Sequence, residues 1–418
     1  MRLWYNAVTI LLTILLLVLG IPFVAALMWV VYFMVQAGPQ RRELPPEPAT
    51  WPSVSVIVPA HNEAERLRGT LASLAQLTYA GPLEIVVIDD RSTDQTAQIA
   101  QEFARTDERF RCIQVTTPSR RMAPKVHASW HGIEQSTGEI IIATDADCVY
   151  HLNWVQTLVR HFTQDVVMVS GYVEINPRQV DTLGKRIEAA DWFSLMLTSR
   201  SMNQAGNGWA SSANNQAYLR SAFEAVGGFG TGGKAPSGDE DILAQRLAAL
   251  PGAKTVLTTH LEARVYTTPM PTFLSFIKQR RRWVSRYHHP IHYDLWFLGA
   301  IATLGFESVV LVVSLALLPW LPALAPYALT IYALQTAVHI TGMNIGAKQL
   351  GTPYFGGWLS VVWALLHPVI IGTVVVWSFI KPGAWYAGAH DYRKTLIRRR
   401  LRVLKRTLTS LVKTPPTV

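Results

Sequence analysis

The chain has 418 residues, of which half are hydrophobic and only 16% are charged, a balance that is unusual for a soluble enzyme. Its net charge of +10 does not indicate nucleic-acid binding, because nine Lys/Arg and one Asp fall in residues 391–418 and account for +8 of it. The two cysteines, Cys112 and Cys148, offer no disulfide framework and are typical of a reducing compartment.

The N-terminal segment, residues 1–38, predicts a transmembrane helix, since its apolar run is longer than the about 20 helical residues that cross a bilayer. A secretory signal peptide is the alternative, but no small-residue cleavage site comes after the run. Residues 39–52 are a Pro-rich linker. Arg41 and Arg42 favour the cytoplasmic side for the domain that begins at residue 53, in a multi-pass protein of the cell (inner) membrane.

Residues 53–268 have the pattern of an α/β catalytic domain. Short β-branched runs predict strands at 54–58, 84–88 and 140–143, and the stretches 63–77 and 93–104 predict helices between them. Strands that are continuous apolar runs indicate a mostly parallel sheet covered by helices on both faces. Ligands of such sheets bind at the carboxyl ends of the strands.

Polar and acidic residues follow each of the three predicted strands. They are Pro59, Ala60, Asn62 and Glu63 after the first, Asp89 and Asp90 after the second, and Asp145 and Asp147 after the third. Carboxylates gathered at one edge repel one another and need a cation or a donor-rich ligand. The spacing of Asp145 and Asp147 suits a hard divalent ion, Mg²⁺ or Mn²⁺, completed by phosphates.

Two later features add candidate chemistry to this edge. Lys125 is a candidate point charge for a diphosphate, with an ordinary surface lysine as the alternative. Glu240 and Asp241 open an amphipathic helix, where a carboxylate could take a proton from an attacking hydroxyl. The alternative for these acids is plain stabilisation of a helix N-terminus.

The segment 269–292 predicts an interfacial amphipathic helix that carries Gln279, Arg282 and Trp283. About three membrane segments are predicted in residues 293–382, and a basic amphipathic tail in residues 383–418. Three full crossings conflict with a basic tail on the cytoplasmic side. A re-entrant hairpin over residues 355–380, broken at His367 and Pro368, would resolve that conflict.

Taken together in this order, these motifs resemble the D, DxD, ED, QxxRW series of membrane-integrated inverting glycosyltransferases of family 2, such as cellulose, chitin and hyaluronan synthases and ceramide glucosyltransferases. The resemblance covers about residues 53–290 and implies a GT-A fold. It implies nucleoside contacts for Asp89 and Asp90, metal and diphosphate contacts for Asp145 and Asp147, and a general base at Asp241, with Asp239 as the alternative.

On the acceptor side, the same resemblance implies gating by Gln279, Arg282 and Trp283, together with Glu240, and it puts Asn214 in an acceptor-lining loop. We expect transfer of one sugar from a nucleotide donor, typically UDP-linked, to a membrane lipid, because the hydrophobic segments are few for a polymer channel. A processive polysaccharide synthase acting on a glycan is the main alternative, and a catalytically silent membrane scaffold is a third. The expected partners are the donor, the acceptor and the bilayer, without nucleic acid.

Overall fold

The structure is a computed structural model that describes residues 43–119, 121–204, 211–230, 233, 239–285 and 325–380, with a few positions between 308 and 319. The predicted N-terminal transmembrane helix (1–38), the basic tail (383–418) and most of the first predicted membrane segment after residue 292 lie outside the described residues.

A seven-stranded sheet forms the centre of the domain, in the order β3-β2-β1-β4-β8-β6-β9. Strand β8 is antiparallel to both of its neighbours, and the other described pairings in this sheet are parallel. This confirms the predicted α/β class with a mostly parallel sheet. The strands are β1 (Val54–Ala60), β2 (Leu83–Asp90), β3 (Phe110–Val115), β4 (Ile140–Ala143), β6 (Val166–Gly171), β8 (Gln216–Leu219) and β9 (Lys254–Thr258).

Both faces of the sheet are covered, as continuous apolar strands require. In β1, Val56 and Val58 join one core with Leu67 and Leu71 of α2, whereas Ile57 joins a second core on the opposite face. The covering helices are α2 (Ala64–Ala75), α3 (Thr96–Thr106), α4 (Pro124–Glu134), α5 (Trp154–Val159), α7 (Arg220–Ala225) and α8 (Asp239–Ala248).

A small second sheet connects this domain to the C-terminal helices. Its order is β5-β10-β7, with β5 at Cys148–Tyr150, β7 at Val173–Ile175 and β10 at Val265–Thr267. Strand β5 begins at the residue after Asp147, and β10 leads into α9 (Phe273–Val284). Within the described residues, short 3₁₀ turns lie at Pro177–Gln179, Leu261–Ala263 and Pro353–Phe355.

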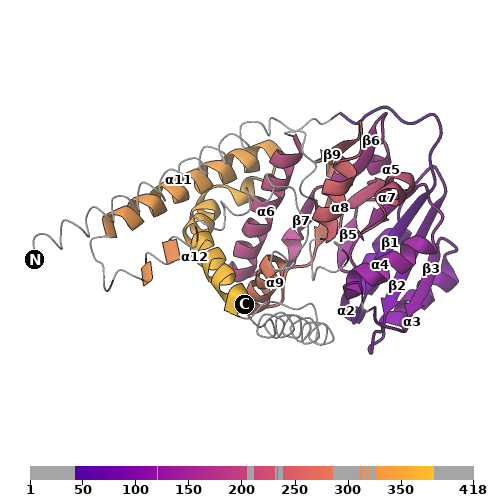
Figure 1. Ribbon diagram of the computed structural model, residues 1–418, viewed down its shortest axis with the longest axis horizontal. Coiled ribbons are helices and arrows are strands. Elements are labelled where there is room, and N and C mark those ends of the chain that lie inside the picture. The colour runs from indigo at the N-terminus through magenta and orange to yellow at the C-terminus, as the bar shows by residue number, and fades with distance from the viewer. Residues whose placement is uncertain are drawn as a thin grey trace, which may run out of the picture.

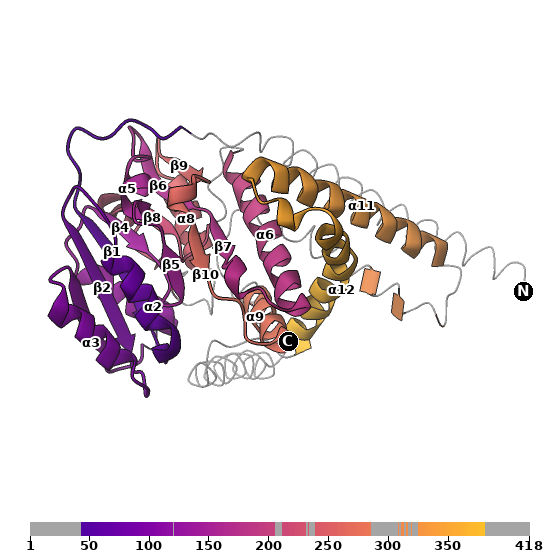
Figure 2. The ribbon, with the colours of Figure 1, turned by 180° about the vertical axis from the view of Figure 1, so that it is seen from behind.

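The long helix α6 (Leu183–Gln204) lies beside α9 and the two C-terminal helices, α11 (Ala325–Leu350) and α12 (Trp358–Ile380) (Figures 1 and 2). Among the described residues, α12 alone is long and apolar enough to cross a membrane, over Trp358–Ser378. The hairpin proposed for residues 355–380 is wrong, because α12 continues through Pro368. Packing on α6, α9 and α11 holds it together, and the Tyr332 hydroxyl donates to the Leu365 carbonyl oxygen (2.6 Å) close to the proline.

Candidate active site

The acidic residues predicted at one sheet edge do meet there. Strand β1 pairs in parallel with both β2 and β4, with Ala60 opposite Asp89 and Ile57 opposite Ala143, so the three carboxyl ends lie side by side. Pro59 and Ala60 are themselves the last two residues of β1. Asn62 and Glu63 come directly after β1, and Asp145 and Asp147 come after β4.

The end of β2 is held by local contacts. Asp90 is buried, and its carboxylate accepts hydrogen bonds from Arg91 Nε (2.8 Å) and Nη2 (3.1 Å). The buried carboxylate of Asp89 accepts from the Ser92 backbone N–H at 3.2 Å. Arg91 has a φ of 59°, in the left-handed region that non-glycine residues rarely adopt. The loop is therefore strained, as loops at functional sites often are.

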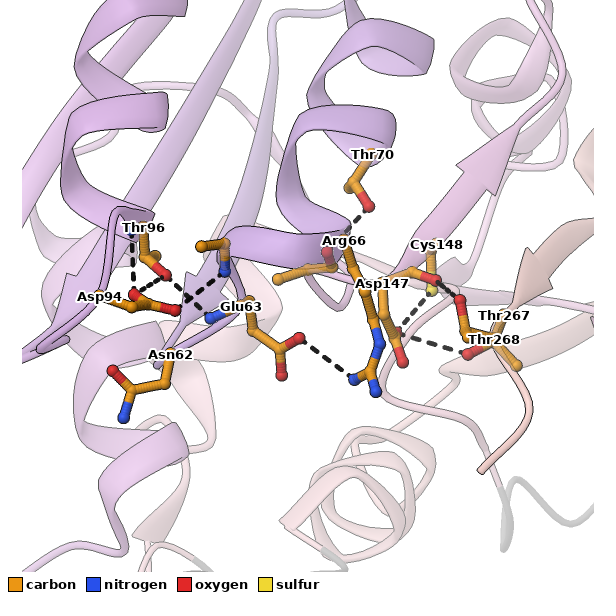
Figure 3. Close-up of polar contacts among 12 residues, drawn as sticks. Asn62, Glu63, Arg66, Thr70, Asp94, Thr96, Asp147, Cys148, Thr267 and Thr268 are labelled. Carbon is orange, nitrogen blue, oxygen red and sulfur yellow. Dashed lines mark hydrogen bonds and ion pairs between the residues drawn. The ribbon is translucent and has the colours of Figure 1, made fainter. Parts of the chain in front are cut away.

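The loop after β1 is tied to the loop after β2. Asn62, with a φ of 55°, accepts from the Thr93 backbone N–H through Oδ1 at 2.8 Å. The Asp94 carboxylate accepts hydrogen bonds from the backbone N–H groups of Ala64 (3.1 Å) and Thr96 (3.0 Å), the first residues of α2 and α3 (Figure 3). One carboxylate thus serves two helix N-termini, although the residue directly before α3 is Gln95.

The turn that carries Asp145 and Asp147 is held from two sides. On the α2 side, Thr70 Oγ1 donates to the Ala146 carbonyl oxygen at 2.8 Å. On the β10 side, Thr267 Oγ1 donates to Asp147 Oδ1 (3.4 Å) and Thr268 Oγ1 donates to the Asp147 carbonyl oxygen (3.2 Å), as Figure 3 shows. These contacts link the turn to the segment that leads into α9.

Burial and mutual repulsion raise the pKa of two of these acids. The pKa of Glu63 is raised to about 7, mainly by burial and next by the Asp147 charge. The pKa of Asp147 is raised to about 6, mainly by burial and next by Asp145. Such shifts are typical of sites that accept a cation.

Two basic side chains flank the acidic cluster. Lys125 Nζ lies 2.5 Å from Asp145 Oδ1, so the lysine proposed for the diphosphate reaches the site. Arg66 was not predicted from the sequence; its Nη1 lies 3.3 Å from Glu63 Oε2, and its guanidinium points toward Glu63 and Asp147 (Figure 3). The positive charge of Arg66 lowers the pKa of Glu63 and of Asp147, but the net shift of both pKa values is upward. The sequence signal that could have indicated Arg66 is its position three residues after Glu63, which puts the two side chains on the same helix face.

The donor set fits a hard divalent cation only in part. Asp145 and Asp147 offer carboxylate oxygens, the ligand type that Mg²⁺ and Mn²⁺ prefer. Within the described parts of the chain, no three His, Cys, Asp or Glu side chains converge as a metal-binding group. A cation at this turn would therefore take its remaining oxygens from a bound molecule or from water.

The later acids lie at the start of α8, close to this turn. Asp241 is buried, and its Oδ1 accepts from the Ser211 backbone N–H at 3.1 Å. The Glu240 carbonyl oxygen accepts from Gln216 Nε2 of β8 at 3.2 Å. The side chain of Asp239, the alternative base, lies outside the described residues.

Arg282 of α9 lies within electrostatic range of Asp145 and Glu240. Burial lowers the pKa of its guanidinium to about 9, and the Asp145 and Glu240 carboxylates oppose that shift. A strand-end acid, a residue of α8 and a residue of α9 that are far apart in the sequence are thus electrostatically coupled.

The remaining predicted acceptor-side residues are anchored by their neighbours. Asn214 is buried, and its carbonyl oxygen accepts from Thr144 Oγ1 at 2.9 Å, next to Asp145. Gln279 Oε1 accepts from Arg280 Nη1 at 2.8 Å. The Trp283 ring lies 4.2 Å from the Arg280 guanidinium carbon and 5.5 Å from the Trp192 ring centroid.

A comparison with family profiles agrees with this arrangement: the profile described as "Glycosyl transferase family 2" matches residues 55–227. The match is a similarity that covers less than half of the chain, and we call the matched segment, residues 55–227, the family 2 domain. The family 2 domain takes in the acids at the ends of β1, β2 and β4, and the match ends before Asp241 and α9.

Relatives of the family 2 domain include the glycosyltransferase AglE of Haloferax volcanii, 32% identical over 143 residues, which are 34% of this chain and 46% of AglE. A poly-beta-1,6-N-acetyl-D-glucosamine synthase of Staphylococcus epidermidis is 26% identical over 66% of each chain. The chain thus spans less than half the length of the first of these relatives.

Among solved structures, the mannosyltransferase PcManGT from Pyrobaculum calidifontis, in complex with GDP-Man and Mn²⁺, has a TM-score of 0.55. The two are 20% identical, and the match covers 87% of this chain and 98% of PcManGT. This likeness confirms the GT-A-like fold and extends beyond the family 2 domain.

Proposed function

We propose that this protein is an inverting glycosyltransferase that moves one sugar from a nucleotide-sugar donor to a membrane lipid. The observation that carries the proposal is the gathering of the strand-end acids of the family 2 domain at one sheet edge, where Lys125 pairs with Asp145 and the Arg282 charge also acts on Asp145. Sugar transfer from a diphosphate donor needs acids that hold a metal, a general base and a cation near the leaving group. In this proposal the turn with Asp145 and Asp147, helix α8 and helix α9 supply these parts.

The donor half of the site is assigned to the sheet edge. Asp89 and Asp90, with Pro59, Ala60, Asn62 and Glu63 on the neighbouring strand end, are proposed to contact the nucleoside, which we take to be uridine. Asp145 and Asp147 would hold Mg²⁺ or Mn²⁺, whose role is to neutralise the donor's diphosphate. PcManGT, which shares the fold, was solved with GDP-Man and Mn²⁺.

Asp241 is assigned as the general base. It would take the proton of the acceptor hydroxyl while the new bond forms at the anomeric carbon and the bond to the diphosphate breaks on the opposite face. This single displacement inverts the anomeric configuration. Lys125 and Arg282, the basic residues associated with Asp145, would stabilise the negative charge that develops on the leaving diphosphate.

Support for a lipid acceptor comes from the C-terminal helices. The exposed apolar residues of α12 form one stripe at helical spacing, namely Trp358, Val361, Leu365, Leu366, Val369, Val376 and Ile380. Its opposite side is buried at Leu359, Trp363 and Ala364. In α9, Phe273 and Leu274 are also exposed. A bilayer that covers these surfaces would place α9 at its cytoplasmic face.

The second candidate is a processive polysaccharide synthase. It is favoured by the Staphylococcus epidermidis relative, whose name states that it makes a polymer of N-acetylglucosamine. Purified protein supplied with labelled UDP- and GDP-sugars, Mn²⁺ and membrane lipid extract separates the two. An organic-soluble product supports the lipid acceptor and an ethanol-precipitable polymer supports the synthase. If neither metal-dependent transfer nor donor hydrolysis is detected, the result supports the third alternative, a catalytically silent membrane scaffold.

A further inference from the structure

The buried ion pair between Asp191 of α6 and Arg280 of α9 includes none of the predicted site residues. Arg280 Nε is 2.5 Å from Asp191 Oδ2, and the two side chains are only 3% and 4% exposed. The pair joins residues that are 89 positions apart. Arg280 itself lies inside the segment from Gln279 to Trp283.

Arg280 contacts both ends of that segment. It donates to Gln279 Oε1 at 2.8 Å, and its guanidinium carbon lies 4.2 Å from the Trp283 ring. Arg282 is two residues further on, which is more than half a helical turn away, so it points to another side of α9. There Arg282 is within electrostatic range of Asp145 and Glu240. Fixing Arg280 on one side of α9 therefore fixes the direction in which Arg282 is presented.

Helix α6 also holds the chain where α9 begins. The Glu188 carboxylate accepts from the Met270 backbone N–H at 3.0 Å, just before the first residue of α9. Glu188 and Asp191 are three residues apart and lie on the same face of α6. Trp192, the next residue, packs edge-on against Trp283. One face of α6 thus supports α9 at its start and in its last turns.

The C-terminal helix α12 contributes to the same arrangement. His367 Nε2 lies 3.7 Å from Asp191 Oδ1, and the Arg281 guanidinium carbon lies 4.1 Å from the Trp377 ring. The apolar helix that carries the exposed stripe is therefore in contact with both α9 and the residue of α6 that orients it.

We propose that Asp191 is a positioning residue that, through Arg280, sets the rotation of α9 so that Arg282 faces the reacting diphosphate, and that His367 links this setting to α12. The inference rests on the proposed glycosyl transfer. A residue that acts only by orienting Arg282 has nothing left to orient once Arg282 is removed, and this gives a specific test.

The test is a double-mutant cycle in full-length protein, with wild-type transfer measured first. Absence of transfer by the wild type would refute the proposed function rather than this inference. Asp191→Asn should lower kcat for transfer about tenfold or more, and in the Arg282→Gln background it should add less than about twofold. Hydrogen exchange should quicken in residues 273–284 and stay slow in β1 and β2. Asp181→Asn is the matched control, since Asp181 is exposed and pairs with Lys185 in the first turn of the same helix.

His367→Gln guards against misfolding of Asp191→Asn, because it leaves the Asp191–Arg280 pair intact. We expect His367→Gln to lower kcat about threefold in otherwise wild-type protein and to cause no comparable further loss in the Arg282→Gln background. The proposal would be overturned if the loss of kcat in a variant that folds multiplied in full with the loss caused by Arg282→Gln. Unchanged transfer in both Asp191→Asn and His367→Gln would overturn it equally.

Discussion

Lys125 Nζ and Asp145 Oδ1 form a 2.5 Å ion pair at the acidic sheet edge, although α4 and β4 deliver them from different layers of the domain. The lysine thus stabilises one of the two carboxylates proposed to bind metal, and it is placed to contact a diphosphate that arrives with that metal. The same pair supplies the first prediction.

Replacing Lys125 by Met should weaken binding of the nucleotide diphosphate with Mn²⁺ by about tenfold or more, because a partly buried charge pair to phosphate is lost. Isothermal titration calorimetry measures this directly. Lys254→Met is the control, since Lys254 of the edge strand β9 also pairs with an aspartate, Asp165, but in an exposed position. Equal affinities for the Lys125 variant and wild type would remove Lys125 from the donor site.

Arg66→Ala should weaken metal-dependent donor binding below pH 7. Without the guanidinium, the pKa values of Glu63 and Asp147 should rise further, so that more of the protein holds protons where the cation must bind. The expected result is an upward shift in the pH at which Mn²⁺ supports half-maximal nucleotide binding. Arg68→Ala, which breaks a solvent-exposed pair with Glu102, should leave that midpoint in place.

The metal-free protein should lose stability as pH rises from about 4.5 to about 7. Glu63 and Asp147 have raised pKa values when folded, so between their unfolded and folded pKa values the native state binds more protons than the unfolded state. The free energy of unfolding then falls with pH across this window. Thermal unfolding in EDTA should show a weaker fall for Glu63→Gln and Asp147→Asn than for wild type. Identical slopes would contradict the assigned shifts.

Metal binding should have the opposite pH dependence, because a divalent ion requires the deprotonated acids. Addition of Mn²⁺ with nucleotide diphosphate should therefore stabilise the protein more at a pH above the pKa values of both acids than at a pH below them, in the same melting experiment. A stabilisation that does not change with pH would place the ion away from Asp147.

Asp241→Asn should reduce transfer by about 10²–10⁴-fold while nucleotide binding stays near that of wild type, because the amide cannot accept the hydroxyl proton. Product formation and calorimetry on the same preparation measure the two effects. Glu224→Gln serves as control, since Glu224 is exposed on α7. Near-normal turnover of Asp241→Asn would shift the assignment to Asp239.

The sequence predicted the parts of the site that depend on local pattern. Apolar runs located β1, β2 and β4, and the acids come after those strands because parallel strands end at one edge. Strand β8 was missed because it comes after a polar stretch, Ser211–Asn215, and its burial comes from β4 and β6 on either side. The Asp191–Arg280 pair could not be predicted either, since nothing local indicates that charges 89 residues apart will be buried together.

The packing of α12 has a consequence for how the protein can be handled. One hydrophobic core runs from Val54 of β1 to Ala364 of α12, and within it Phe193 of α6 stacks on Phe355 with ring centroids 4.5 Å apart. A fragment cut after α9 would expose the α6 side of this core to water. The α/β domain and its apolar helix therefore constitute one folding unit, and a soluble version will have to be obtained by redesigning the outer stripe of α12 rather than by removing the helix.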